Sequence, residues 1–370
     1  MNFEDIITQY GKTLDLQISI ISNNKIEDVI YKSNIKSVSR QFSCELLKSC
    51  TKYIDVTLVG VYDLKGKEIN IKLGARLDEQ ADFVYKDLGN YIIDDNSIST
   101  SVATHITKFT AYDYMYRALT EYDLNLSFPI TVDDFIKAIA DRLDFIFTQG
   151  DYPNKNTLIK EDMYKDSIPT FRSVLDELSG VCGGIIYVDK NELKIMTPKN
   201  RNTIREMSRS NQKSIEINEL FGPINRLLVH KDDVIYTQTS STDEDGEINV
   251  EENEEDNSID IDRTDEQSIA TNGLNQITIN NNLILNTNIE AFIDEIWDSL
   301  NGFFYYPFTI DSFGFILDPF ERIKLVDEQS EYQMFVLNDT LNISDGISEI
   351  FSADVPNVKE TQYDLSLIQI

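Results

Sequence analysis

The sequence predicts an α+β protein that is mainly β, and three observations point to this fold class. Short runs of alternating apolar and polar residues recur along the first and last thirds of the chain. Amphipathic helical segments interrupt these runs, and Tyr (18) and Phe (19) far outnumber Trp (1), as is usual in sheets and interfaces. The order strands, helix–hairpin, strands, helix, strands indicates two β modules, each with a smaller insertion. With 370 residues, two to four domains are expected.

The first third is predicted to be an antiparallel sheet that is closed or folded on itself. Apolar residues occupy every second position at 14–20, 54–58 and 69–73, and further strand-like runs follow at 88–93 and 105–112. A period of two places alternate side chains on opposite faces of a strand. Turn-rich segments separate these runs, which is the spacing of a small barrel or sandwich.

A helix–hairpin unit follows, covering roughly residues 125–212. Thr131 fits the N-cap of a first helix, and a second helix over 168–180 is expected to stop at Gly180. The next segment, 183–197, has the pattern of two strands joined by a tight turn. A helix leading into a hairpin makes a compact α+β unit.

A third helix is predicted near the end of the chain. Thr287 and Glu290 match a capping box, and Gly302 fits the C-terminal stop of this helix. Strand-like runs follow it, with a hairpin predicted to turn at 328–330.

The charge of the chain excludes several classes of partner. It has 64 acidic and 33 basic residues, a net charge of −31. Nucleic acids and anionic membranes are bound through Lys and Arg, so sequence-independent affinity for either is disfavoured. No apolar run approaches the roughly 20 residues that span a bilayer. The N-terminus lacks the features of an export signal, which favours synthesis in the cytoplasm without membrane insertion.

An acidic insert concentrates part of this charge. Residues 243–266 contain 13 carboxylates and one Arg, and a mobile segment is predicted over 240–268. Within it, Ser241–Glu252 resembles a calcium-binding EF-hand loop, except that Ser replaces the Asp required at the first place and no helices are predicted on either side. We therefore favour weak cation attraction over a specific calcium site.

The sequence predicts no catalytic, cofactor-binding or metal-binding residues, and hence no enzyme. The only histidines are His105, in a predicted strand, and His230, beside a predicted turn, and no nucleophile or phosphate-binding motif accompanies them. Cys44, Cys50 and Cys182 are odd in number, which favours small, buried, reduced thiols over a disulfide. Paired carboxylates are too abundant to identify a glycosidase. The aromatic run 301–315 fits a packed strand and turn better than a sugar-binding platform.

Six segments follow one another along the chain: they are ELLKSCTKYIDVTLVGVYDLKGKEINIKLG, FVYKDLGNYIID, TKFTAYDYM, PITVDDFIKAIADRL, FRSVLDELSGVCGGIIYVDKNELKI and FIDEIWDSLNGFFYYPFTIDSFGFILDPFERIKLVD. Together these segments resemble the N-terminal domain of siphophage tail-hub proteins, the tail-associated lysin family that shares the baseplate-hub fold of contractile-tail phages. None is catalytic, and the resemblance rests on their joint order, which covers nearly the whole chain.

The resemblance implies four domains. Residues 1–124 would form a first β-barrel-like tube domain, and the strands of 213–285 with 322–370 a second. The segments 125–212 and 286–321 would be peripheral, the first α+β and the second small and helical. Two similar tube domains per chain would let a homotrimer imitate a sixfold ring.

The partners implied are therefore structural. The trimer would join the distal tail protein or the sixfold tail tube to threefold tip, fibre or lysin proteins. It would line a conduit through which DNA passes without specific binding, in a phage tail tip assembled in the host bacterial cytoplasm. Many relatives continue into a hydrolase or a stalk, whereas this sequence ends soon after residue 354, so wall cleavage is not expected of it. The alternatives are a cell-surface polysaccharide-binding module and a peptidoglycan-degrading tail lysin.

Overall fold

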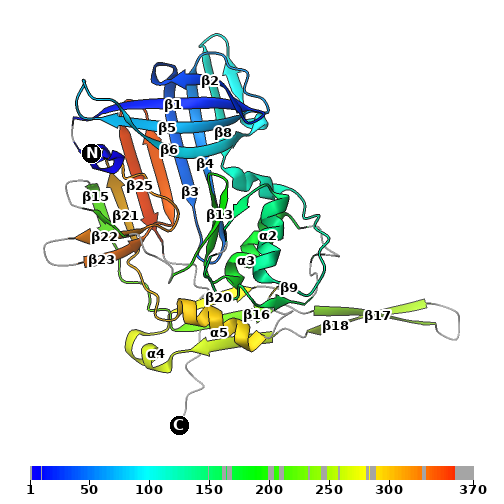
Figure 1. The fold of residues 1–370 in the computed structure, drawn as a ribbon. Helices are drawn as coiled ribbons and strands as arrows, with labels where there is room; N and C mark the ends of the chain where they lie inside the picture. Colours follow the sequence, from blue (N-terminus) through cyan, green and yellow to red (C-terminus); the bar gives the residue numbers. More distant parts are fainter. Residues whose placement is uncertain are drawn as a thin grey trace.

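The fold is α+β and mainly β, as the sequence predicts (Figure 1). The structure is a computed structural model. It describes residues 2–9, 11–148, 150–160, 164, 169–198, 204–207, 212–231, 234–242, 248–256, 259–280, 283, 289–326 and 331–354.

One large, mostly antiparallel sheet of 15 strands organises the molecule. Its main path is β15 (Gln212–Ile217), β21 (Phe308–Ser312), β25 (Ile347–Ala353), β24 (Asn338–Ile343), β3 (Ile35–Ser43), β4 (Ser49–Val59), β8 (Ile106–Tyr112), β6 (Val84–Ile93), β5 (Glu68–Arg76), β1 (Thr13–Ser22) and β2 (Lys25–Tyr31). Off this path lie β7 (Ser99–Ser101), β10 (Ile146–Phe147), β12 (Ile185–Asp189) and β13 (Glu192–Met196). The strands predicted in the first third are therefore confirmed, and they belong to this sheet.

The sheet folds over on itself. Figure 1 shows β1, β5 and β6 crossing over β3, β4 and β25 at a steep angle, the arrangement of orthogonally packed sheets. Ile18 of β1 lies opposite Ile71 of β5, and both are fully buried in the apolar cluster between the layers. Val38, Ile54 and Val56 reach the same cluster from β3 and β4. The apolar residues at alternate positions thus fill a core between two layers of one sheet.

The helix–hairpin unit is attached to this sheet. In α2 (Val132–Arg142) the N-cap is Thr131, whose hydroxyl accepts a hydrogen bond from the Asp134 amide at 3.0 Å, as predicted. Helix α3 (Phe171–Val181) ends one residue after Gly180. The hairpin β12–β13 follows, and β12 pairs in parallel with β4. The predicted elements are confirmed, and their hairpin extends the main sheet.

A second apolar cluster lies between this unit and the C-terminal elements. Helix α5 (Ile289–Leu300) buries Phe292, Ile293 and Ile296 in it. Gly302 follows with φ +74, the left-handed conformation of a helix stop, as predicted. Thr287, predicted to open its capping box, lies outside the described residues.

Shorter elements complete the fold. The three-stranded sheets are β16 (Arg226–Lys231), β19 (Ile259–Thr264) and β20 (Gln276–Asn280), and β14 (Ile204–Met207), β22 (Arg322–Val326) and β23 (Glu331–Phe335). Two-stranded pairs are β9 (Ile130–Thr131) with β11 (Leu158–Ile159), and β17 (Val234–Thr242) with β18 (Ile248–Asp256). The remaining helices are α1 (Phe3–Ile7), α4 (Glu266–Asn272) and the 3-10 turns η1 (Lys32–Asn34), η2 (Asp95–Ser97) and η3 (Tyr114–Leu119).

Regular structure occupies much of the acidic insert. Strands β18 and β19 and helix α4 lie within or overlap 240–268, and the β17–β18 hairpin extends away from the body in Figure 1. The EF-hand-like positions Asp243, Asp245 and Gly246 lie outside the described residues, as does the predicted turn at 328–330. The mobility of the insert stays a prediction.

The four-domain division also stays a prediction, but strand pairing crosses its boundaries. Strand β24 pairs with β3, so C-terminal strands continue the sheet of the first 124 residues. Strand β21, within 286–321, lies between β15 and β25. Among the described strands the main sheet has an open order from β15 to β2, without closure into a ring.

One expectation about the cysteines is wrong. Cys44 and Cys50 are joined by a disulfide across the turn between β3 and β4, whereas the sequence favoured reduced thiols. The two residues are six positions apart in sequence, but the chain reverses between them, and their Cα atoms lie 5.1 Å apart, within the usual range for a disulfide. Cys182 is a buried free thiol, as expected.

A pair of substitutions in β5 tests the folded-over core. Ile71→Ala should lower the free energy of unfolding by about 2–5 kcal/mol, because a fully buried side chain leaves a cavity. Lys72→Ala, at the next and exposed position, should change it by no more than about 0.5 kcal/mol. Urea unfolding measures both, and equal effects would contradict the placement of this strand.

Candidate assembly surface

A buried polar joint fixes the C-terminal strands to the N-terminal ones. Arg40 of β3 is 2% exposed and donates to the Asp339 carboxylate of β24 at 2.9 Å. The same guanidinium donates to the backbone carbonyl of Leu317 at 2.6 Å. A buried cation needs such partners, and here they come from positions almost 300 residues away in sequence.

Glu349 of β25 organises the loop that crosses this joint. Its buried carboxylate accepts backbone hydrogen bonds from Phe315, from Ile316 at 2.8 Å and from Leu317 at 3.1 Å. Gly314 opens the loop with φ +108, and a Cβ there would lie 2.6 Å from Ile347, so this position requires glycine. The loop between β21 and β22 is thus held around one carboxylate.

A second group of charges lies around Lys52 of β4. The Asp113 carboxylate accepts hydrogen bonds from the backbone amides of Lys52 at 2.8 Å and Met115 at 3.2 Å. The Lys52 ammonium lies 3.4 Å from Asp318, on the loop beside Glu349. These contacts connect η3, β4 and the C-terminal loop.

The environments of these acids shift their pKa values in opposite directions. Burial raises the pKa of Asp113 to about 7, although Lys52 acts against it. Desolvation would also raise the pKa of Asp318, but Lys52 and Arg40 outweigh it and lower that pKa to about 2. Burial and the neighbouring Glu349 hold the pKa of Asp339 well above its usual range. Such shifts arise in structural charge networks as well as in active sites.

The main sheet has two free edges that can meet another chain. Among the described strands, β2 pairs only with β1, and β15 pairs only with β21. Strand β2 exposes Ile26 (64%) and Tyr31 (57%), and β15 exposes Ile215 (38%). Unpaired edge strands with exposed apolar residues are templates for pairing with a second chain.

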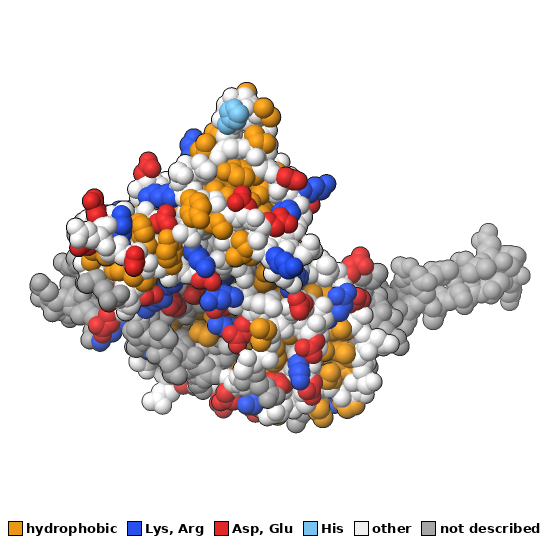
Figure 2. Space-filling view, turned by 45° about the horizontal axis from the view of Figure 1, so that its top comes forward, with side chains coloured by type: hydrophobic (Ala, Val, Ile, Leu, Met, Phe, Trp, Pro, Cys, Tyr) orange, Lys and Arg blue, Asp and Glu red, His pale blue; other side chains and the backbone are white. Residues whose placement is uncertain are grey.

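An apolar tip lies where two turns meet. The Gly60 amide donates to the His105 carbonyl at 2.7 Å, which brings the turn after β4 beside the turn before β8. Val59, Val61 and Val102 are exposed there, Val102 by 70%. Figure 2 shows hydrophobic side chains gathered over the upper part of this face, with acidic and basic groups mixed among them.

The charge is unevenly distributed along the sequence. Residues 1–124 contain 18 acidic and 14 basic residues, a net of −4, so the rest of the chain carries −31 + 4 = −27. The mixed charges in Figure 2 agree with the near-neutral N-terminal part. Any strongly acidic surface must therefore come mainly from residues after 124.

The two histidines lie on different elements of the fold. His105 is exposed in a turn with φ 49, and its predicted place in a strand is wrong. His230 is the second-last residue of β16, and its Nδ1 lies 2.6 Å from Asp260 on the neighbouring β19. The described residues contain no group of three His, Cys, Asp or Glu side chains suited to a metal ion.

The aromatic run is packed, which confirms the interpretation favoured from sequence. Tyr305 is 2% exposed and donates its hydroxyl to the Asp354 carbonyl at 2.6 Å. Its ring and that of Phe303 both pack against Phe335. Phe304 is the exposed member of the run, at 39%. In the described part of the chain, no helix has the length and apolar character to cross a membrane.

No sequence pattern indicates the buried joint. Arg40, Asp339 and Glu349 lie in ordinary strand patterns, and single charged residues within strands usually face solvent. Only the pairing of β3 with β24 brings them together.

Phage tail proteins of known structure share this fold. The tail protein from Neisseria meningitidis MC58 aligns with a TM-score of 0.56 and 13% identity, over 92% of this chain and 97% of that chain. The prophage MuSo2 43 kDa tail protein from Shewanella oneidensis gives 0.52 and 13%, over 92% and 98%. Prophage tail protein gp18 from Listeria monocytogenes EGD-e gives 0.53 and 9%, over 92% and 95%. No protein-family model and no curated protein matches the sequence.

Asp113 gives the group of charges around Lys52 a pH dependence that can be measured. Its pKa is about 7 in the folded chain against 3.8 ordinarily, so the folded state holds the proton more tightly. The stability it contributes is complete below pH 3.8 and is lost as the pH rises through 7. Asp113→Asn removes this titration. Relative to the variant, the wild type should lose up to about 4 kcal/mol of unfolding free energy between pH 4 and pH 7.

Urea unfolding at several pH values measures this difference. Subtracting the two proteins cancels the titration of all other groups that the substitution leaves undisturbed. A difference that is constant with pH would show that the carboxylate is ionised in the folded protein as it is in the unfolded chain.

Proposed function

We propose that this chain is a structural component of a phage or phage-like tail, a homotrimeric hub at the tail tip without enzymatic activity. The hub joins the sixfold tail tube or distal tail protein to threefold tip, fibre or lysin proteins. The proposal includes two predictions made from the sequence. The chain is similar to siphophage tail-hub proteins in the order of its segments, and it is divided into four domains. The particle is assembled in the cytoplasm of a bacterial host.

The observation that carries the proposal is the extent of the structural match. The similarity covers 92% of this chain and nearly all of three tail proteins, so it includes the insertions as well as the sheet. The buried joint supports a structural role, because Arg40 and Glu349 are buried and hydrogen-bond within the chain. The aromatic run, which a polysaccharide-binding module would expose, is largely buried.

The free sheet edges supply the contacts between copies. Strand β2 of one copy and β15 of the next are different surfaces, so their pairing is head-to-tail, and head-to-tail contacts that close after three steps form a ring. DNA passes through the centre of this ring without specific binding. Acidic residues after position 124, on the wall of the passage, repel phosphates and keep the DNA mobile.

The mass of the purified protein tests the proposal. Light scattering should give three times 42.5 kDa, about 128 kDa, at high protein concentration, or that mass plus the mass of the bound partner after mixing with the tail-tube protein. The double variant Ile26→Lys with Tyr31→Lys should remain at 42.5 kDa, because the added charges block the β2 edge. Both side chains are exposed, so the unfolding midpoint should stay unchanged.

Leu158→Lys is the matched control. Leu158 is 48% exposed on β11, outside the main sheet, and its replacement should leave the trimer intact. A wild-type protein that stays monomeric under all these conditions would overturn the hub proposal. A trimer that survives the β2 substitutions would overturn the edge contact alone.

A further inference from the structure

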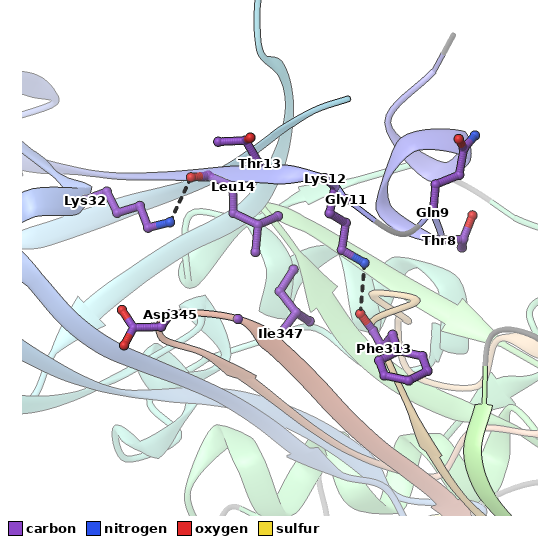
Figure 3. Close-up of a pocket in the computed structure, with 11 residues that line it drawn as sticks. Thr8, Gln9, Gly11, Lys12, Thr13, Leu14, Lys32, Phe313, Asp345 and Ile347 are labelled. Carbon is purple, nitrogen blue, oxygen red and sulfur yellow. Dashed lines mark hydrogen bonds between the residues drawn. The ribbon is translucent and has the colours of Figure 1, made fainter. Parts of the chain in front are cut away.

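A pocket of about 480 Å³ lies between the N-terminal segment and the β24–β25 turn. Its walls come from the residues after α1, the start of β1, η1, Phe313 and the turn that carries Asp345. Lys12 and Lys32 both line it, and in Figure 3 the apolar side chains of Leu14 and Ile347 lie between their ammonium groups. This volume is in the range of ligand-binding pockets in proteins.

Each of these ammonium groups is held by backbone carbonyls. Lys12 donates to the carbonyls of Ile7 and, at 3.4 Å, Phe313. Lys32 donates to the Leu14 carbonyl at 2.9 Å. An ammonium has three donors, so both lysines retain donors beyond these bonds.

The absence of carboxylate partners sets these two lysines apart. Within the described part of the chain, no carboxylate oxygen lies within 4 Å of the Lys12 or Lys32 ammonium. Asp345 is exposed at the rim of the pocket and forms an ion pair with neither lysine. Five other buried or half-buried lysines do have one: they are Lys52, Lys67, Lys86, Lys155 and Lys194. In a chain with 64 acids and 33 bases, two unneutralised lysines in one pocket are unexpected.

Lys12 is also partly desolvated. Burial lowers the pKa of its ammonium, since the positive charge has lost water without gaining an anion. A carboxylate bound in the pocket would supply that anion and form charge-assisted hydrogen bonds with the remaining donors.

We propose that this pocket binds an acidic peptide segment in which two carboxylates flank an apolar side chain. One carboxylate contacts Lys12, the other contacts Lys32, and the apolar side chain packs on Leu14 and Ile347. The segment belongs to a neighbouring protein of the assembly, either a second copy of this chain or another tail component. The binding site itself does not depend on the trimer, because all of its walls come from one chain.

Residue-resolved amine labelling of the wild-type chain tests the site. The probe is acetyl-Asp-Ile-Asp-amide at millimolar concentration, and mass spectrometry follows the acylation rate of each lysine. The probe should slow the labelling of Lys12 and Lys32 several-fold and leave the exposed Lys72 unchanged. Calorimetry should show binding that is lost in the Lys12→Met, Lys32→Met double variant and kept in Lys72→Met.

Three results would overturn the proposal. They are no protection by the probe, equal protection by acetyl-Asn-Ile-Asn-amide, and equal protection by inorganic phosphate.

The source of the segment is found by zero-length carbodiimide coupling in a mixture of heavy-nitrogen-labelled and unlabelled chains. Cross-links from Lys12 or Lys32 to a copy with the other label support the site and identify a second copy as the partner. Their absence, when the probe protects both lysines, supports the site and assigns the segment to another tail component.

Discussion

The pairing of β3 with β24, secured by Arg40, Asp339 and Glu349, is the constraint on which the rest of the structure depends. A buried guanidinium and two buried carboxylates are costly unless ion pairs and hydrogen bonds offset the loss of water. Their contacts join positions 40, 317, 339 and 349. The free-energy cost of burying these charges is therefore offset only when the N-terminal and C-terminal strands pair in the observed register. These contacts therefore favour the observed register of β3 and β24.

This joint explains why the sequence predicts single strands and helices well but predicts the pairing of distant strands poorly. Alternation at 69–73 and the N-cap at Thr131 are local signals, and β5 and α2 follow them closely. The continuation of the first sheet into β24 and β25 depends on contacts between segments about 300 residues apart. Neither period nor propensity encodes such pairing.

The same reason accounts for the features that were missed or misplaced. The disulfide between Cys44 and Cys50 depends on the reversal of the chain between β3 and β4, which cysteine spacing does not reveal. His105 is the first residue of the predicted strand-like run 105–112 but lies in the turn before β8, with a left-handed backbone. Lys12 and Lys32 are unremarkable in sequence, and only the folded chain brings them to one pocket. The mainly β class and the absence of catalytic motifs, by contrast, could be read from the residues alone.

The open sheet edges and the concentration of acidic residues after position 124 fit the proposed role as a subunit of a tail tip. Electron microscopy of negatively stained particles tests this account most directly. It predicts rings with threefold symmetry and a central hole in class averages of the protein bound to its tail-tube partner. Isolated globules, or rings of another symmetry without a passage, would contradict it.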